Sequence, residues 1–167
     1  PSIQKFIVTS TADVTIEKVV SNSWPTSITA KNVAFTGTTY NSVSINVEET
    51  ATFNGGTYNN EVVVIGSEND AEAVINGGVF NHNFKSSVDT TIKGGSLPYV
   101  DADINGVADY MLIMNAGKTL TVEKADSAFG PLFATSGADC KLVYDTQDIK
   151  DFYSGLEGSN WSNISVK

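Results

Sequence analysis

The segment Ala51-Thr-Phe-Asn-Gly-Gly-Thr-Tyr58 occurs in four versions in this chain. The other three are Val33-Ala-Phe-Thr-Gly-Thr-Thr-Tyr40, Ala73-Val-Ile-Asn-Gly-Gly-Val-Phe80 and Thr90-Thr-Ile-Lys-Gly-Gly-Ser-Leu97. The first glycines of the four versions are 18, 22 and 17 residues apart, at Gly37, Gly55, Gly77 and Gly94. An apolar pattern that returns after about 20 residues predicts a solenoid in which each repeat forms one coil.

Each repeat has the chemistry of β-strands. Apolar residues alternate with polar ones, as at Val43, Ile45 and Val47, and a period of two is typical of strands. The apolar positions hold β-branched or aromatic residues, which favour strands, and the glycines allow a positive φ at a corner. We therefore expect each coil to contain a strand, a glycine corner, a second strand, an asparagine turn and a third strand.

Stacked coils would align equivalent side chains in three ladders. Two apolar ladders would lie inside the solenoid, where full burial of each side chain contributes roughly 1.5–3 kcal/mol. The third ladder consists of asparagines, which tolerate turn conformations and can bond one another along the stack, so we interpret it as structural. The predicted ladders are Phe35, Phe53, Ile75 and Ile92; Tyr40, Tyr58, Phe80 and Leu97; and Asn41, Asn59 and Asn81.

The Ile-x-Gly-Gly-x-Phe-Asn pattern of the repeats resembles that of right-handed parallel β-helix proteins, the pectin-lyase-like superfamily. This superfamily includes polysaccharide lyases and hydrolases, bacterial surface adhesins and phage tailspikes. The resemblance implies an all-β fold, a short right-handed parallel β-helix solenoid with end caps, but it implies no particular activity. The competing left-handed β-helix needs a strict six-residue aliphatic period, which these repeats do not keep.

The two ends of the chain are expected to cover the open ends of a single-domain solenoid. We predict an N-terminal cap or atypical first coil at residues 1–31, the repeats at 32–125, and a C-terminal cap at 126–167. Near the end of the repeats we expect strands at 110–114 and 119–122, and at the start of the C-terminal cap we expect a loop at 125–140. The C-terminal cap has the one clear helix signal, with Asp145 as its N-cap and Gly155 at its end. Its apolar face would consist of Ile149, Phe152 and Tyr153.

The charge of the chain excludes some classes of partner. The net charge is −9, only 17% of residues are charged, and all ten basic residues are lysines. An acidic chain without arginine is a poor candidate for binding nucleic acid or an anionic membrane surface, and no apolar run is long enough to span a bilayer. Cys140 is the only cysteine, so we expect a buried thiol and no internal disulfide.

Residues 101–109 match part of a calcium-binding loop. Their Asp-x-Asp-x-Asn-Gly spacing would turn alternate oxygens toward one cation. The twelfth position, where a bidentate glutamate is expected, is Leu112, and the alternative is a polar turn built on Asn105-Gly106. The candidate Ca²⁺ ligands are Asp101, Asp103, Asn105 and Asp109.

Two aromatic residues are candidate glycan contacts. Trp24, beside Pro25, and Tyr99 could each stack on a sugar ring. The alternative for Trp24 is that it plugs the end of the solenoid, because large aromatic residues dominate core energetics. His82 has no second histidine or cysteine near it in the sequence, so we expect a surface residue in a turn rather than a metal ligand.

The sequence offers no recognisable catalytic constellation. Pectate lyases and pectin methylesterases of the resembled superfamily use an arginine, which this chain lacks, and the polygalacturonase motifs are absent. A glycosidase needs only two carboxylates. The acids available in the repeats are Glu48, Glu49, Glu61, Glu68 and Asp70, but exposed acids are commonly just solvated, and we expect no enzymatic activity.

The resemblance favours a non-enzymatic structural or adhesive protein of a phage particle, either a capsid decoration or a fibre-type component. Its expected partners are other virion proteins, surface polysaccharide and further copies of the chain, for example in a trimer. The sequence begins at Pro1 without an apolar leader, and removal of an initiator methionine would favour this interpretation. A lost leader would favour the first alternative, a fragment of a bacterial cell-surface adhesin. The second alternative is a polysaccharide hydrolase of the tailspike type.

Overall fold

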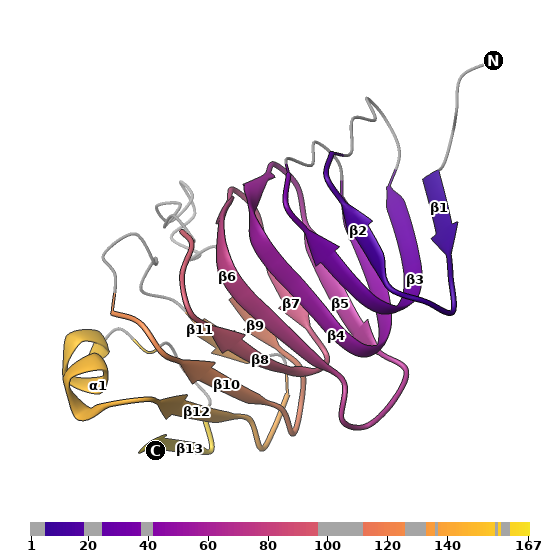
Figure 1. The fold of residues 1–167 in the computed structure, drawn as a ribbon. Helices are drawn as coiled ribbons and strands as arrows, with labels where there is room; N and C mark the ends of the chain where they lie inside the picture. Colours follow the sequence, from indigo (N-terminus) through magenta and orange to yellow (C-terminus); the bar gives the residue numbers. More distant parts are fainter. Residues whose placement is uncertain are drawn as a thin grey trace, which may run out of the picture.

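The chain forms a β-solenoid of about six turns (Figure 1). The structure, a computed structural model, describes residues 6–18, 25–37, 42–96, 112–125, 133–135, 137–155, 157 and 161–167. Every pairing between the described strands is parallel. The strands are β1 (Phe6–Thr9), β2 (Val14–Ile16), β3 (Thr26–Phe35), β4 (Val43–Tyr58), β5 (Val62–Gly66), β6 (Glu72–Phe80), β7 (Phe84–Ser86), β8 (Asp89–Ile92), β9 (Leu112–Met114), β10 (Thr119–Val122), β11 (Phe133–Thr135), β12 (Lys141–Tyr144) and β13 (Asn163–Val166). The predicted parallel β-solenoid is therefore confirmed.

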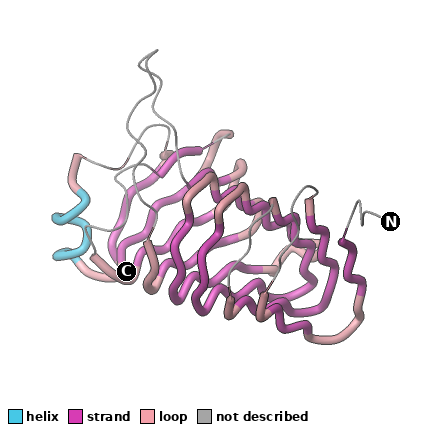
Figure 2. The backbone as a smooth tube through the Cα atoms, turned by 90° about the horizontal axis from the view of Figure 1, so that it is seen from above, coloured by secondary structure: helices cyan, strands magenta, loops and turns pink. Residues whose placement is uncertain are grey.

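Two long faces make up most of each coil. Face 1 contains β1, residues 26–30 of β3, residues 43–47 of β4, and then β5, β7, β9 and β11. Face 2 contains β2, residues 32–35 of β3, 50–53 of β4, 72–75 of β6, and then β8, β10, β12 and β13. The chain turns from face 1 to face 2 within β3, where the pairing register shifts between Ala30 and Asn32. Figure 2 shows the successive coils, with the helix α1 (Gln147–Tyr153) at the C-terminal end.

The glycine pairs bend strands instead of separating them. β4 runs without interruption through Gly55 and Gly56, and β6 does the same through its own pair. The second glycine of the pair in β4 has a φ of 91°, a conformation that residues with a Cβ rarely adopt. The expected glycine corner is present, but the strand on either side of it is the same strand.

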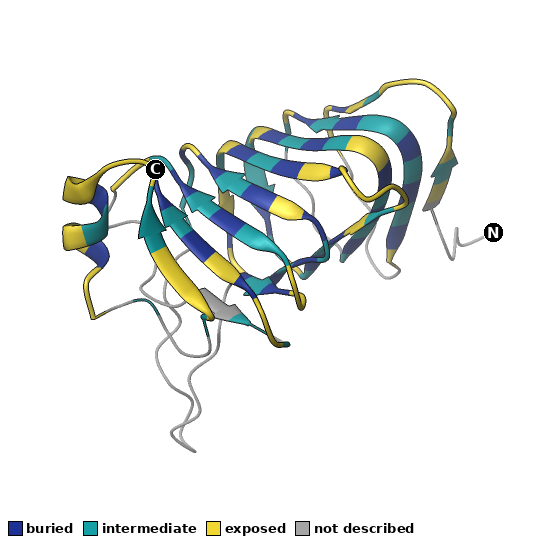
Figure 3. Ribbon diagram, turned by 90° about the horizontal axis from the view of Figure 1, so that it is seen from below, coloured by how far each residue is buried: buried dark blue, intermediate teal, exposed yellow. Residues whose placement is uncertain are grey.

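Buried side chains form continuous columns along the solenoid axis. One column on face 2 consists of Ile16, Phe35, Phe53, Ile75, Ile92, Val122, Tyr144 and Val166, each paired in register with the next. All of these are buried except Val166, which is half-buried. Phe35 and Phe53 stack with ring centroids 5.3 Å apart, and Tyr58 stacks on Phe80 at 4.4 Å. Figure 3 shows the alternation of buried and more exposed positions along the strands. The core is thus built from contacts between coils.

The ends of the chain differ in detail from the expectation. β1 and β2 both pair with β3, so the described part of residues 1–31 forms a coil, and residues 26–30 already belong to a strand of face 1. The predicted loop at 125–140 contains β11, which pairs with β9. β11 has only three residues, and such a short strand lacks a readable period.

The predicted helix is present, but its N-cap was predicted wrongly, and only two of the three residues of its predicted apolar face are buried. The N-cap is Thr146, whose Oγ1 accepts a hydrogen bond from the Ile149 backbone N–H, and not Asp145. Ile149 and Tyr153 are buried, and Tyr153 stacks on Tyr144 of the core. Phe152 is 45% exposed and contacts the Tyr153 ring edge to face, with ring centroids 4.9 Å apart. The C-cap is Ser154, and Gly155, with a φ of 82°, follows it.

Candidate functional site

The outward side chains of face 2 form regular columns, as the inward ones do. The residue between the two buried positions of each strand points outward, and these residues are in register from coil to coil. The central outward column consists of Thr15, Ala34, Thr52, Val74, Thr91, Thr121, Val143 and Ser165. Because neighbouring strands are about 4.8 Å apart, this column is a closely spaced array of small, mostly β-branched side chains.

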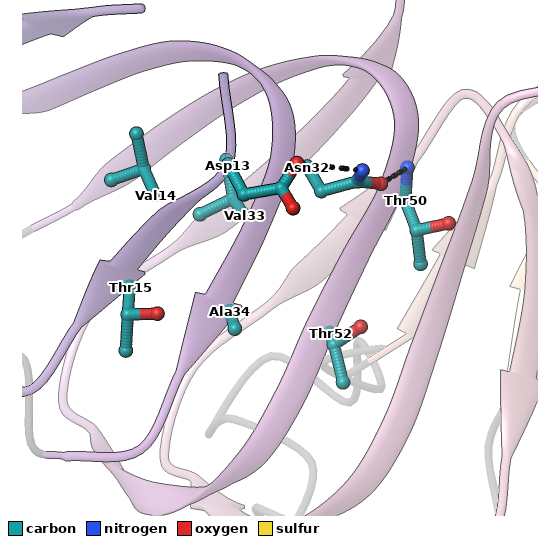
Figure 4. A pocket seen from close by; sticks show the side chains of 8 residues that line it. All are labelled: Asp13, Val14, Thr15, Asn32, Val33, Ala34, Thr50 and Thr52. Atoms are coloured by element: carbon teal, nitrogen blue, oxygen red, sulfur yellow. Dashed lines mark hydrogen bonds between the residues drawn. The ribbon is translucent and has the colours of Figure 1, made fainter.

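A groove of about 390 Å³ interrupts this array near the N-terminal end of the solenoid. It is lined by Asp13, Val14, Thr15, Asn32, Val33, Ala34, Thr50 and Thr52 (Figure 4). Ala34 lies between Thr15 and Thr52 on three neighbouring strands, and it is the smallest side chain of the central column.

A hydrogen-bonded cluster forms one rim of the groove. The Nδ2 of Asn32 donates to Oδ1 of Asp13 at 2.9 Å and to Oε2 of Glu49 at 3.1 Å. The Oδ1 of Asn32 accepts from the backbone N–H of Thr50 at 2.9 Å, and Lys31 forms an ion pair of 3.0 Å with Glu49. Asn32 therefore holds two carboxylates from different coils close to one amide nitrogen.

The protonation state of Glu49 determines what this rim can do. Hydrogen bonds from Lys31, and then from Asn32, hold the pKa of the Glu49 carboxyl below its usual range, and the same contact raises the pKa of Lys31. A glycosidase needs one carboxylic acid with a raised pKa as the proton donor. Glu49 has the opposite shift, so at neutral pH it is a charged hydrogen-bond acceptor.

Among the described residues, no acid named from the sequence lines the groove, and Glu49 is linked to it through the hydrogen bond from Asn32. Glu61 pairs with Lys85 at 2.6 Å, while Glu48, Glu68 and Asp70 are exposed. Asp13 was not predicted as a site residue, although it immediately precedes the strand Val14–Ile16 just as Asn32 and Thr50 precede the equivalent strand segments. Aligning the first coil with the repeats would have identified it.

The predicted ladder residues are brought together wherever the structure describes them. Phe35, Phe53, Ile75 and Ile92 are consecutive in one column, Tyr58 pairs with Phe80, and Asn81 donates to Asn59 at 3.0 Å. A second asparagine pair, Asn76 to Asn54 at 2.9 Å, was missed, although both precede a first glycine of the repeats. Tyr40, Asn41 and Leu97 lie outside the described residues.

The predicted calcium loop and glycan contacts cannot be located in the fold. Asp101, Asp103, Asn105 and Asp109, together with Trp24 and Tyr99, all lie outside the described residues. Within the described ranges, no three His, Cys, Asp or Glu side chains lie close enough together to hold a metal ion. His82 is exposed, and Cys140 is fully buried, as expected. No helix in the described part of the chain is long and apolar enough to cross a membrane.

Comparisons with protein-family models, with curated proteins and with solved structures gave no match to this chain.

Proposed function

We propose that this chain is a non-enzymatic adhesive protein whose groove on face 2 binds an uncharged glycan. The groove itself is the observation that supports this proposal. Its lining contains Thr15, Thr52 and the methyl group of Ala34, and its rim contains the carboxylate of Asp13. Asn32 on the same rim bonds both Asp13 and Glu49. Small-molecule sites generally combine an apolar surface with a few fixed polar groups.

Each part of the groove has a role in sugar recognition. Carboxylates accept hydrogen bonds from sugar hydroxyls, and such charge-assisted bonds are stronger than neutral ones. The threonine hydroxyls both donate and accept, and the Ala34 methyl offers apolar contact to the C–H groups of a sugar ring. The net charge of −9 disfavours acidic polysaccharides through repulsion, so the preferred glycan is uncharged.

The solenoid supplies rigidity to this site. The groove is built on three hydrogen-bonded strands, and the Asn32 bonds fix its rim before any ligand arrives, which lowers the ordering cost of binding. A single small groove gives weak affinity, and several copies on one particle would convert weak contacts into strong attachment. We therefore propose a virion surface role, as a decoration or fibre-type component of the pectin-lyase-like phage kind. A bacterial surface adhesin would attach to glycans through the same weak, multivalent contacts.

The experiment compares two substitutions in the same outward column. Ala34→Val fills the groove with a side chain that already stands at Val74 and Val143 in this column, so the fold should persist. Thr121→Val is the matched control, because it changes an equivalent position outside the groove. On a panel of uncharged and acidic polysaccharides, we expect binding to uncharged glycans only. Ala34→Val should weaken it at least about tenfold, or roughly 1.4 kcal/mol, and Thr121→Val should leave it unchanged.

Two results would refute the proposal. One is wild-type binding to no glycan of the panel, and the other is equal binding by the wild type and Ala34→Val. Release of reducing ends from a polysaccharide would instead support the hydrolase alternative. Mass spectrometry of purified phage particles would separate the virion role from the adhesin role, because a virion component must be present in stoichiometric amounts.

A further inference from the structure

Most polar groups on the rim of the groove are already engaged inside the molecule. The Nδ2 of Asn32 donates one hydrogen bond to Asp13 and one to Glu49. The Oδ1 of Asn32 accepts from the backbone N–H of Thr50. Both oxygens of Glu49 also have a donor, since Lys31 contacts Oε1 and Asn32 contacts Oε2. These side chains therefore shape the rim and leave little hydrogen-bonding capacity for a ligand.

Asp13 differs, because one of its two carboxylate oxygens has no donor. Its Oδ1 accepts from Asn32 at 2.9 Å, and within the described ranges no residue donates a hydrogen bond to its Oδ2. The side chain is exposed and lines the groove (Figure 4). A carboxylate only accepts hydrogen bonds, so this oxygen is complementary to a ligand group that donates one.

The two threonines of the central column supply the opposite capacity. In the part of the chain that the structure describes, the hydroxyls of Thr15 and Thr52 make no hydrogen bond. A hydroxyl can donate to a ligand carbonyl. Ala34 lies between the two threonines in register, so a methyl group stands beside these donors. The groove thus combines one open acceptor, two free hydroxyls and a small apolar surface.

We propose that the preferred ligand of the groove is an uncharged glycan that carries acetamido groups, such as a polymer of an N-acetylhexosamine. This inference rests on the proposed glycan-binding function and names its substrate class. The acetamido N–H donates to Oδ2 of Asp13, its carbonyl accepts from the hydroxyl of Thr15, and its methyl group contacts Ala34. A sugar hydroxyl in the same place can donate to Asp13, but it brings no methyl group to Ala34.

The spacing along the chain fits a group of this size. Asp13 immediately precedes β2, Thr15 lies within it, and both line the groove. Two residues of extended chain span about 6.6 Å. The N–H and C=O of a trans amide point in opposite directions, and with a hydrogen bond on each side the group spans roughly 8 Å. These similar lengths allow one acetamido group to contact Asp13 and Thr15 together.

Charge distinguishes this ligand from chemically related sugars. An acidic sugar is repelled by Asp13 and by the net charge of −9. The ammonium of a deacetylated amino sugar is attracted, but an ion pair with an exposed carboxylate contributes little. The ammonium also offers no carbonyl to Thr15 and no methyl group to Ala34. The acetamido group is the one that uses all three features of the groove.

Three β-1,4-linked trisaccharides that differ only at C2 test the inference. Cellotriose carries hydroxyls there, triacetylchitotriose carries acetamido groups, and chitotriose carries ammonium groups. Galactose, N-acetylgalactosamine and galactosamine extend the test to the other configuration at C4. NMR titration of the labelled protein measures each Kd and shows whether the amide signals of Asp13, Thr15 and Ala34 respond. We expect the acetamido sugar of at least one series to bind at least about tenfold more tightly than its two counterparts.

Asp13→Asn identifies the group that reads the acetamido N–H. The new amide keeps an oxygen for Asn32 and turns an NH₂ toward the ligand. Two N–H donors cannot pair, whereas a sugar hydroxyl can turn and accept. We expect Asp13→Asn to weaken binding of the acetamido sugar at least about tenfold and binding of the hydroxyl sugar less than about threefold.

Asp89→Asn is the matched control. Asp89 lies in the same column as Asn32 and Thr50 but outside the groove, and its Oδ1 likewise accepts a hydrogen bond, from the Thr119 backbone N–H. The substitution should leave the affinities for all the sugars unchanged. Melting curves of both variants verify that they are folded, because both side chains are exposed.

The outcomes separate this inference from the function on which it rests. Equal affinity for hydroxyl and acetamido sugars, tighter binding of the ammonium sugars, or a preference that survives in Asp13→Asn would overturn the inference and leave glycan binding in place. Binding of panel polysaccharides without binding of any acetamido sugar would do the same. Binding of no sugar and no polysaccharide would remove the proposed function and this inference together.

Discussion

The glycine pairs provide a sharp test of the coil geometry, because Gly55 and Gly56 are neighbours with opposite requirements. Gly56 has a φ of 91°, and a Cβ placed on it would lie 2.0 Å from the carbonyl oxygen of Gly37 on the preceding coil. Gly55 has no positive φ, and its nearest contact would be the Thr36 oxygen at 3.8 Å, an ordinary van der Waals distance. Gly56→Ala should therefore destabilise the fold, whereas Gly55→Ala should be tolerated.

The magnitudes follow from these two environments. At Gly56, the left-handed backbone costs an alanine roughly 1–2 kcal/mol, and relief of the overlap with Gly37 costs about 1–3 kcal/mol more, as overpacking generally does. At Gly55, alanine fits the native conformation and stabilises by about 0.4–1 kcal/mol, since it restricts the unfolded chain. For a domain of this size each kcal/mol shifts the melting temperature by about 2–4 °C.

The assay is thermal unfolding followed by circular dichroism for the wild type, Gly55→Ala and Gly56→Ala. We expect Gly56→Ala to melt at least about 5 °C below Gly55→Ala, which should melt at or slightly above the wild type. Gly117→Ala is a useful third variant, because Gly117 has a φ of 74° but no atom near its Cβ direction, and it should show the backbone cost alone. Equal melting temperatures for the two neighbouring variants would refute the close approach of coils at the glycine pair.

Three further predictions concern the core and the ionisable groups. Phe53→Ala removes a ring packed against Phe35 and three other aromatic rings and should lower the free energy of unfolding by about 3–5 kcal/mol, measured with urea. Burial raises the pKa of Tyr58 and of Tyr144, so the folded state favours their neutral form. Their contribution to stability is complete below pH 10 and is lost as the pH rises further. In a pH titration, the tyrosinate absorbance of these two residues should develop only together with unfolding. The lowered pKa of Glu49 gives a contribution that is present above pH 4.5 and is lost as the pH falls, and Glu49→Gln should remove this part of the acid dependence.

The fold was predictable because the core residues of each coil can be recognised from the short segment in which they lie. Phe35 and Phe53 are stacked at 5.3 Å, yet each is recognisable from its own strand period and from the glycine two residues later. Their alignment followed from the repeat alone, without knowledge of any distant contact. Where the apolar pattern weakens, prediction weakened too: residues 26–30 form a strand of face 1, but two of its buried positions hold Thr26 and Ala30 instead of large apolar residues.

The groove was not predictable for a physical reason. Its lining includes Thr15, Ala34 and Thr52, and these three residues are neighbours only in the stack. A small residue on an exposed strand does not by itself predict a groove. The same holds for Asp13 and Glu49, which a single asparagine between them in space brings together.

This architecture determines where function can arise in such a chain. Inward columns are constrained by burial, so a change there alters stability first, as the 0% exposure of Phe53 and Ile75 implies. Outward columns are in register but free of that constraint, and a regular outward column offers a partner the same surface at every coil. Specific binding therefore requires an exception to the regularity. The described part of face 2 has such an exception at Ala34, the smallest side chain of the central outward column. Selection for binding would act on this position, and substitutions there should change binding while leaving the melting temperature nearly unchanged.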